Sequence, residues 1–177
     1  MLNAFLRYNH DPNPLHTSPD IRHRLVHYRP VVGGLGSQLI AFLANVYSMG
    51  KSETILGKAL EAIGAPRESF VVMTKVFYCT VEGGTMTFGD IVAGVNPDDL
   101  GYVNRHGLSR KHIFDAVKAS LRRLNLNYID VLQCHRFDSN VEIPEVMHAL
   151  HDVVQAGYAR YIGMSSCWAW QFHAMQG

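Results

Sequence analysis

Three side chains that can hold or move a proton stand close to short apolar runs. Lys75 ends one such run, His135 follows a second, and Tyr47 precedes the first clear helical pattern. A phenol is a weak acid with a pKa of about 10, and a nearby ammonium group makes it a better proton donor. An imidazole N–H can hydrogen-bond the oxygen that receives the proton. Together, these three groups indicate protonation of a carbonyl oxygen on which negative charge develops.

Reduction of that carbonyl also needs a hydride, which no side chain can supply, so the set implies a nicotinamide cofactor. Each residue alone has a plainer interpretation. Tyr47 could cap the first helix, Lys75 could reach solvent, and His135 could be a core histidine. Only the combination of the three indicates a catalytic site.

Short apolar strands and amphipathic helices alternate from residue 52 onward, which predicts an α/β fold with a parallel sheet. The pattern predicts strands over 70–75, 128–133 and 161–165, and helices over 52–63, 109–124, 143–156 and 168–176. Ligands of such sheets gather at the carboxyl ends of the strands, where Lys75 and His135 stand. Periodicity alone leaves two architectures open, a doubly wound sheet and a barrel.

Serine residues and apolar spacing define the helices. Ser52 and Ser109 are the expected N-caps, and glycines follow the first and third helices. The first helix is expected to bury one apolar face, made of Ile55, Leu56, Ala59, Leu60 and Ile63. The second is expected to bury Ile113, Ala116, Val117, Ser120, Leu121 and Leu124.

Two stretches lack such patterns. Prolines and turn formers in residues 1–30 predict irregular structure, whereas 31–43 could be a strand and loop or a short helix. Residues 78–108 are rich in Gly, Asn and Asp and are expected to form a long loop, which in a compact domain is usually functional or disordered.

Five ordered motifs resemble the aldo/keto reductases. They are Val46–Leu60 (VYSMGKSETILGKAL), Val72–Phe77 (VMTKVF), Gly107–Leu124 (GLSRKHIFDAVKASLRRL), Tyr128–Asp138 (YIDVLQCHRFD) and Ala156–Cys167 (AGYARYIGMSSC). The likeness covers about residues 44–176. It is closest to the fungal aryl-alcohol-dehydrogenase-like branch, which is also akin to potassium-channel β subunits.

The resemblance implies a (β/α)8 barrel that uses NADP(H) to interconvert aldehydes or ketones and alcohols, so a small carbonyl or alcohol is the expected partner. It implies Tyr47 as the proton donor, Lys75 as the group that makes Tyr47 a better acid, and His135 as the residue that orients the substrate. Ser165 and Ser166 match positions that contact the nicotinamide carboxamide.

The chain departs from this pattern in three ways. The family's fourth catalytic residue is an aspartate shortly before the tyrosine, yet there is no acidic residue between Asp20 and Glu53. Residues 1–43 do not resemble the family and form a separate, atypical segment in this interpretation, ahead of a barrel domain at 44–177. A full barrel needs about 250 residues, so the 177 present predict its first half, with impaired activity.

An incomplete barrel also has open strand edges, which predicts self-association through that edge. The rival function is a non-catalytic pseudoenzyme or a β-subunit-like interaction module. Turnover of an aldehyde with cofactor would distinguish the enzyme from the module.

Composition excludes several other classes. A formal net charge of +1 argues against nucleic acid as a partner. Three well-separated cysteines support neither a disulfide framework nor a metal clip, which favours a reducing compartment and a cytoplasmic location. No apolar run is long enough to predict a membrane span. His148 and His151 are expected to be a surface pair, no metal is expected, and the glycines at 34 and 36 are expected to form a plain turn.

Overall fold

The computed structural model describes residues 4–6 and 39–177 of the chain. In these ranges the strands are β1 (Ala4–Leu6), β2 (Leu39–Phe42), β3 (Phe70–Val76), β4 (Ile129–Cys134) and β5 (Ala159–Met164). The α-helices are α1 (Lys51–Ile63), α2 (Phe88–Val92), α3 (Arg110–Leu124), α4 (Ile143–Gln155) and α5 (Ala169–Gln176). Three short 3-10 turns, η1 (Tyr47–Gly50), η2 (Arg67–Ser69) and η3 (Pro97–Leu100), lie between them.

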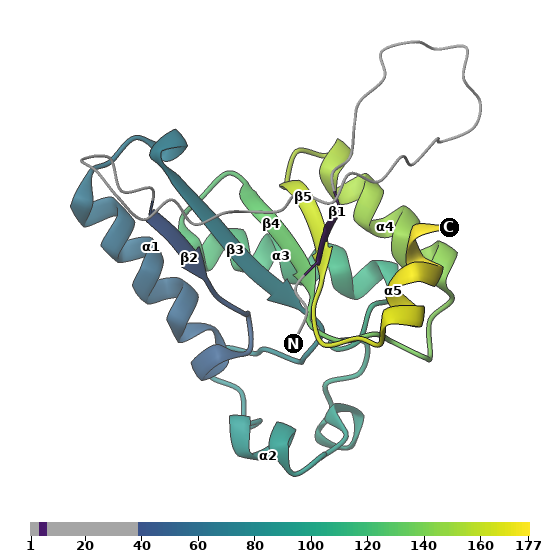
Figure 1. Cartoon of the computed structure of the whole chain (residues 1–177). Coiled ribbons are helices and arrows are strands. Elements are labelled where there is room, and N and C mark those ends of the chain that lie inside the picture. Colours follow the sequence, from purple (N-terminus) through teal and green to yellow (C-terminus); the bar gives the residue numbers. More distant parts are fainter. Residues whose placement is uncertain (1–3, 7–38) are drawn as a thin grey trace.

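One sheet in the order β1-β5-β4-β3-β2 runs through the molecule (Figure 1). Strands β2 to β5 are parallel, because each is linked to the next by a helix that returns the chain to the same end of the sheet. Strand β1 pairs antiparallel with β5, so one edge of the parallel sheet is covered by the chain's own N-terminal residues. The expectation of irregular structure is therefore wrong for Ala4–Leu6.

Helices α1, α3 and α4 pack side by side in one layer, and α5 packs on α4. A doubly wound sheet has helices on both faces, whereas a β/α barrel has them on one face only. The parallel strands with helices between them therefore fit a partial barrel, and the α/β prediction is confirmed. The core lies between the helix layer and the sheet and is centred on Val72, Ile113, Leu132, Leu150 and Ile162.

The prediction for the second helix is confirmed in detail. Ser109 is the N-cap of α3 and accepts a hydrogen bond from the backbone N–H of His112, and all six expected positions are buried. The prediction for the first helix is partly wrong. Ile55 and Ile63 are 67% and 63% exposed, and the buried residues of α1 are Glu53, Gly57 and Leu60.

The start of α1 is also different from the prediction. Its N-cap is Gly50, in a left-handed conformation with φ of +87°, and Ser52 lies one residue inside the helix. Further along, Gly57 allows close packing on α3, because a Cβ there would lie 2.5 Å from the backbone oxygen of Leu124. Helix α1 therefore packs through backbone contact and a buried carboxylate as well as through Leu60.

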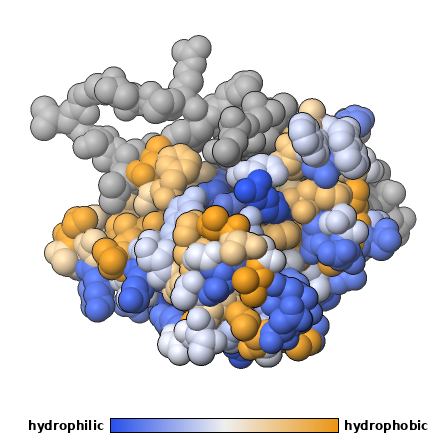
Figure 2. Space-filling view, turned by 90° about the horizontal axis from the view of Figure 1, so that it is seen from below, coloured by the Kyte–Doolittle hydropathy of each residue, from blue (hydrophilic) through white to orange (hydrophobic). Residues whose placement is uncertain are grey.

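Residues 78–108 form the expected long connection, although it contains the short helix α2 and the turn η3. The backbone N–H of Gly107 donates to the oxygen of Phe77 over 2.7 Å and closes the base of this loop. Asp138 fixes the same base by accepting a hydrogen bond from the N–H of Leu108 over 2.7 Å. The loop projects beyond the carboxyl ends of the strands (Figure 1), and seen from below its face mixes apolar and polar residues (Figure 2).

Two tryptophans at the start of α5, Trp168 and Trp170, are exposed. Among the described residues, no group of three metal-ligating side chains occurs and no helix is long and apolar enough to cross a membrane. The glycines at 34 and 36 lie outside the described residues. The division of the chain at residue 43 stays a prediction, although β2 falls within the first segment and pairs with β3.

Candidate active site

Tyr47 stands at the start of a tight turn beyond the carboxyl end of β2. The next two residues, Ser48 and Met49, are left-handed with φ of 51° and 52°, and Gly50 continues this conformation. This unusual turn leads directly into α1. Tyr47 remains 40% exposed, so part of the residue is accessible to solvent.

Lys75 lies near the end of β3 and is only 9% exposed. Its Nζ is 5.4 Å from the centre of the Tyr47 ring and donates a hydrogen bond to the backbone oxygen of Leu43 over 2.8 Å. No carboxylate of the described residues forms an ion pair with it. Burial lowers the pKa of Lys75 from its ordinary value of 10.5, as expected for a buried ammonium group without a counter-charge.

His135 follows β4 directly, and its ring meets that of Tyr47 edge to face at 6.0 Å. Burial lowers the pKa of His135 to about 4, and the charges of Lys75 and Arg136 contribute in the same direction. The imidazole is therefore neutral at physiological pH and can serve as a hydrogen-bond donor through one nitrogen. The structure thus brings the three predicted residues Tyr47, Lys75 and His135 together.

Strand register explains why these side chains share one face of the sheet. Lys75 pairs with Gln133, and Gln133 pairs with Gly163, so all three lie on one face. Because side chains alternate along a strand, His135 and Ser165, each two residues further on, lie on that face too.

The two predicted cofactor-binding serines end β5. Ser165 is buried, and its Oγ is 3.4 Å from that of Ser166, which has a left-handed backbone with φ of 50°. Nearby on the same face, the Nε2 of Gln133 is buried and has no partner among the described residues. A carboxamide needs both donors and acceptors, and two hydroxyls with an unpaired amide N–H offer both. The residues present therefore fit the nicotinamide end of such a cofactor.

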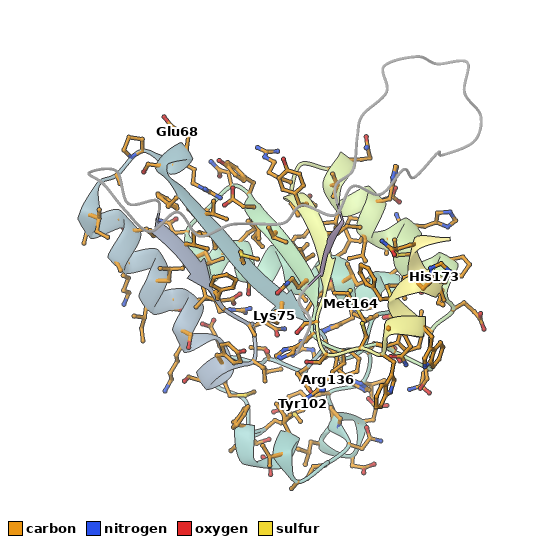
Figure 3. The ribbon with its side chains drawn as sticks, in the orientation of Figure 1. Glu68, Lys75, Tyr102, Arg136, Met164 and His173 are labelled. Carbon is orange, nitrogen blue, oxygen red and sulfur yellow. The ribbon has the colours of Figure 1, made fainter. Side chains whose placement is uncertain are left out.

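Several neighbours of the site were not selected from sequence. The ring of Tyr78 meets His135 edge to face at 5.2 Å, and its hydroxyl accepts a hydrogen bond from Nε of Arg136 over 3.0 Å. Asn45 donates to the backbone oxygen of Tyr78, which ties the Tyr47 turn to the start of the long loop. Figure 3 shows Lys75 at the lower end of the sheet, with Arg136 below it. Arg136 could have been selected from the sequence, because it directly follows His135.

Comparison with known proteins decides the family. The sequence pattern of the aldo/keto reductase family matches residues 42–176. This chain is an aldo/keto reductase family member. An aldo-keto reductase of Fusarium vanettenii is 48% identical over 139 residues, which cover 75% of this chain and 37% of that protein. A putative aryl-alcohol dehydrogenase of Schizosaccharomyces pombe is 47% identical over 135 residues, with 75% and 38% covered.

A versiconal hemiacetal acetate reductase of Aspergillus parasiticus is 47% identical over 133 residues, which cover 75% of this chain and 38% of that enzyme. The resemblance to fungal aryl-alcohol-dehydrogenase-like members of the aldo/keto reductase family is confirmed. This chain spans less than half the length of these relatives.

Phe42 is five residues before Tyr47, in the stretch that has no acidic residue. Phe42 pairs with Met73, so it lies on the same sheet face as Lys75, and it is 57% exposed. We expect Phe42→Asp to raise the pKa of Lys75, because a carboxylate on the same sheet face favours the ammonium form. The measurement is a 13C NMR titration of the Lys75 side chain. Phe42→Asn is the uncharged control, and an equal Lys75 pKa in both variants would contradict the prediction.

Proposed function

We propose that this chain carries the proton-donating part of an oxidoreductase site that interconverts aldehydes or ketones and alcohols of the aryl-alcohol type, with NADP(H) as cofactor. The observation that carries the proposal is the convergence of a phenol, an ammonium group and an imidazole. Tyr47 lies 5.4 Å from the Lys75 nitrogen and 6.0 Å from the His135 ring, measured to the Tyr47 ring centre. Family membership supports oxidoreductase chemistry in general.

Each side chain has a distinct role in this proposal. Tyr47 donates the proton to the carbonyl oxygen, and in its protonated state Lys75 stabilises the phenolate that remains. His135 stays neutral because its pKa is about 4, so it orients the carbonyl oxygen through an N–H without adding charge. Ser165, Ser166 and Gln133 would hold the nicotinamide carboxamide. The bound cofactor supplies or accepts the hydride.

We propose that the activity is impaired, because the lowered pKa of Lys75 leaves less of the ammonium form than a carboxylate partner would maintain. The same observation favours the second candidate, a non-catalytic member of the family that retains the site without efficient turnover. We further propose a cytoplasmic location, which the three free cysteines support. Self-association would use the β2 edge, since β1 covers the β5 edge.

Cofactor binding tests the proposal first. We expect NADPH to bind the 177-residue chain saturably at micromolar concentrations, followed by the fluorescence of the cofactor. Ser165→Ala should weaken NADPH binding about tenfold, because it removes one hydrogen bond that contributes roughly 1 kcal/mol or slightly more. Ser69→Ala, at an exposed turn, is the control and should leave affinity unchanged.

The outcomes separate the candidates. Binding followed by turnover of an aromatic aldehyde supports the enzyme, and binding without turnover supports the non-catalytic member. No saturation up to millimolar NADPH would overturn the proposal of activity for this chain.

A further inference from the structure

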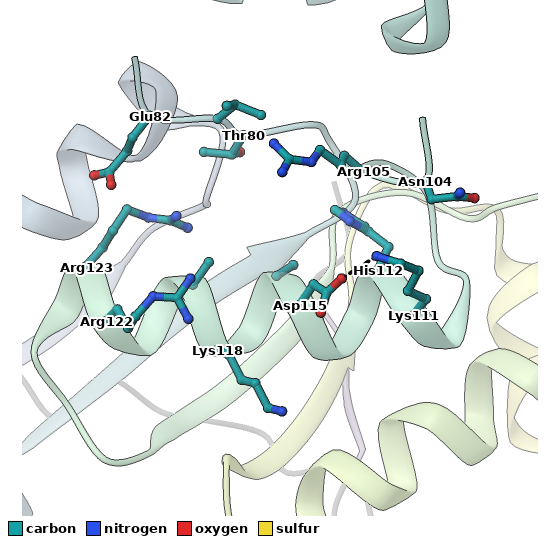
Figure 4. Close-up of a pocket in the computed structure, with 13 residues that line it drawn as sticks. Thr80, Glu82, Asn104, Arg105, Lys111, His112, Asp115, Lys118, Arg122 and Arg123 are labelled. Atoms are coloured by element: carbon teal, nitrogen blue, oxygen red, sulfur yellow. Dashed lines mark hydrogen bonds and ion pairs between the residues drawn. The ribbon is translucent and has the colours of Figure 1, made fainter. Parts of the chain in front are cut away.

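A groove of about 390 Å³ lies between the outer face of α3 and the two ends of the long loop. One wall is formed by Thr80, Val81 and Glu82 and continues through Asn104 and Arg105 (Figure 4). The floor is hollow because Ala116 and Ala119 have small side chains. None of the lining residues belongs to the candidate active site, and the proposed function does not use this groove.

Cationic side chains are concentrated around the groove. Five of the sixteen Lys and Arg residues of the chain line the groove, but only two carboxylates do. The cations are Arg105, Lys111, Lys118, Arg122 and Arg123, and the carboxylates are Glu82 and Asp115. The chain as a whole has a net charge of only +1, so this accumulation is local. Lining positions at intervals of three or four along α3 place these side chains on one helical face.

Two of these cations are neutralised within the protein and the others are not. Lys111 pairs with Asp115 over 2.6 Å, and Arg123 pairs with the buried Glu53 over 2.7 Å. No ion pair involves Arg105, Lys118 or Arg122 in the described part of the chain. The Nζ of Lys118 lies 5.6 Å from the centre of the Tyr158 ring. Two guanidinium groups and one ammonium group therefore remain available to an anion.

Unsatisfied polar atoms lie at the same place. Oγ1 of Thr80 and Nε2 of His112 are buried and lack hydrogen-bond partners among residues 4–6 and 39–177. His112 is itself only 5% exposed. Buried polar atoms in native proteins are usually paired with protein, water or a bound molecule. An oxygen-rich ligand that reaches the floor of the groove would supply the missing partners.

We infer that this groove binds a phosphate-bearing small molecule. The planar fork of an arginine matches two phosphate oxygens at once, and Arg105 and Arg122 come from opposite walls of the groove. Lys118 also lines the groove one turn from Arg122, and its side chain points away from the loop wall (Figure 4). The volume is in the range of ligand pockets and is large enough for a diphosphate group with part of its substituent.

Inorganic pyrophosphate is the probe, titrated into the 177-residue chain at physiological salt and followed by 15N NMR. We expect saturable shifts of the amides of Thr80, Arg105 and Lys118. Arg122→Gln should weaken pyrophosphate binding about tenfold or more, because it removes a charge-assisted hydrogen bond to the anion. Arg160→Gln removes the same charge from an exposed site outside the groove and should have no effect.

Competition with NADPH separates this site from the proposed cofactor site. Groove binding that persists with saturating NADPH and is lost in Arg122→Gln supports the inference, whether or not NADPH itself binds. Shifts at Ser165 and Ser166 instead of the groove amides would overturn it, as would equal weakening by Arg122→Gln and Arg160→Gln. Absence of saturation at millimolar pyrophosphate would also overturn it.

Discussion

Tyr47→Phe should reduce the rate of NADPH-dependent aldehyde reduction by about 10²- to 10⁴-fold, the usual contribution of a positioned general acid. The substitution removes only the phenolic oxygen, so the ring that meets His135 and faces Lys75 is retained. Because the proton is needed in the transition state, kcat should fall far more than KM rises. The assay is steady-state reduction of an aromatic aldehyde, carried out in the native chain and in Phe42→Asp, where Lys75 has a counter-charge.

Tyr78→Phe is the matched control for this prediction. Its ring also meets His135 edge to face, at 5.2 Å, and it loses the same hydroxyl, which is bonded to Arg136. The proposed role of Tyr47 predicts a small effect of Tyr78→Phe on kcat. Equal losses in the two variants, or full activity of Tyr47→Phe, would show that the proton comes from another group.

Glu53→Ala should lower the free energy of unfolding by about 3–5 kcal/mol, which is a large share of the stability of a typical domain. Glu53 is fully buried between α1, β3 and α3. Its carboxylate accepts hydrogen bonds from Nε of Arg123 over 2.7 Å and from the hydroxyl of Thr74 over 2.5 Å. Removal of the carboxylate leaves the guanidinium group of Arg123, whose side chain is 7% exposed, without its counter-charge.

Urea unfolding measures this difference, and two further variants establish its cause. Asp115→Ala breaks the exposed pair with Lys111 and should cost about 1 kcal/mol at most. Glu53→Leu combined with Arg123→Leu removes both charges and should recover much of the stability lost in Glu53→Ala. If the double variant were as unstable as Glu53→Ala, the loss would come from packing and not from an unpaired charge.

The amino-acid sequence alone determined the α/β alternation and the elements whose signals are local. Helix α3 is the clearest case, since its cap at Ser109 and its six buried positions follow from neighbouring residues within a few turns. The missing counter-charge of Lys75 was also readable, because no acidic residue occurs between Asp20 and Glu53. The predicted strand ends also placed Lys75 and His135 at the same edge of the sheet, because the carboxyl ends of parallel strands lie together.

Only the tertiary structure decided the features that depend on distant partners. Glu53 and Gly57 are buried in α1 because Arg123 and Leu124 meet them from α3, about 70 residues away, so the apolar stripe identified the buried face only in part. The helices on one side of the sheet distinguish a partial barrel from a doubly wound sheet. The groove beside α3 likewise combines residues from separate segments. Local propensity determines whether a segment forms a helix or a strand. Long-range contacts determine which face of that helix or strand is buried and which charged groups lie against it.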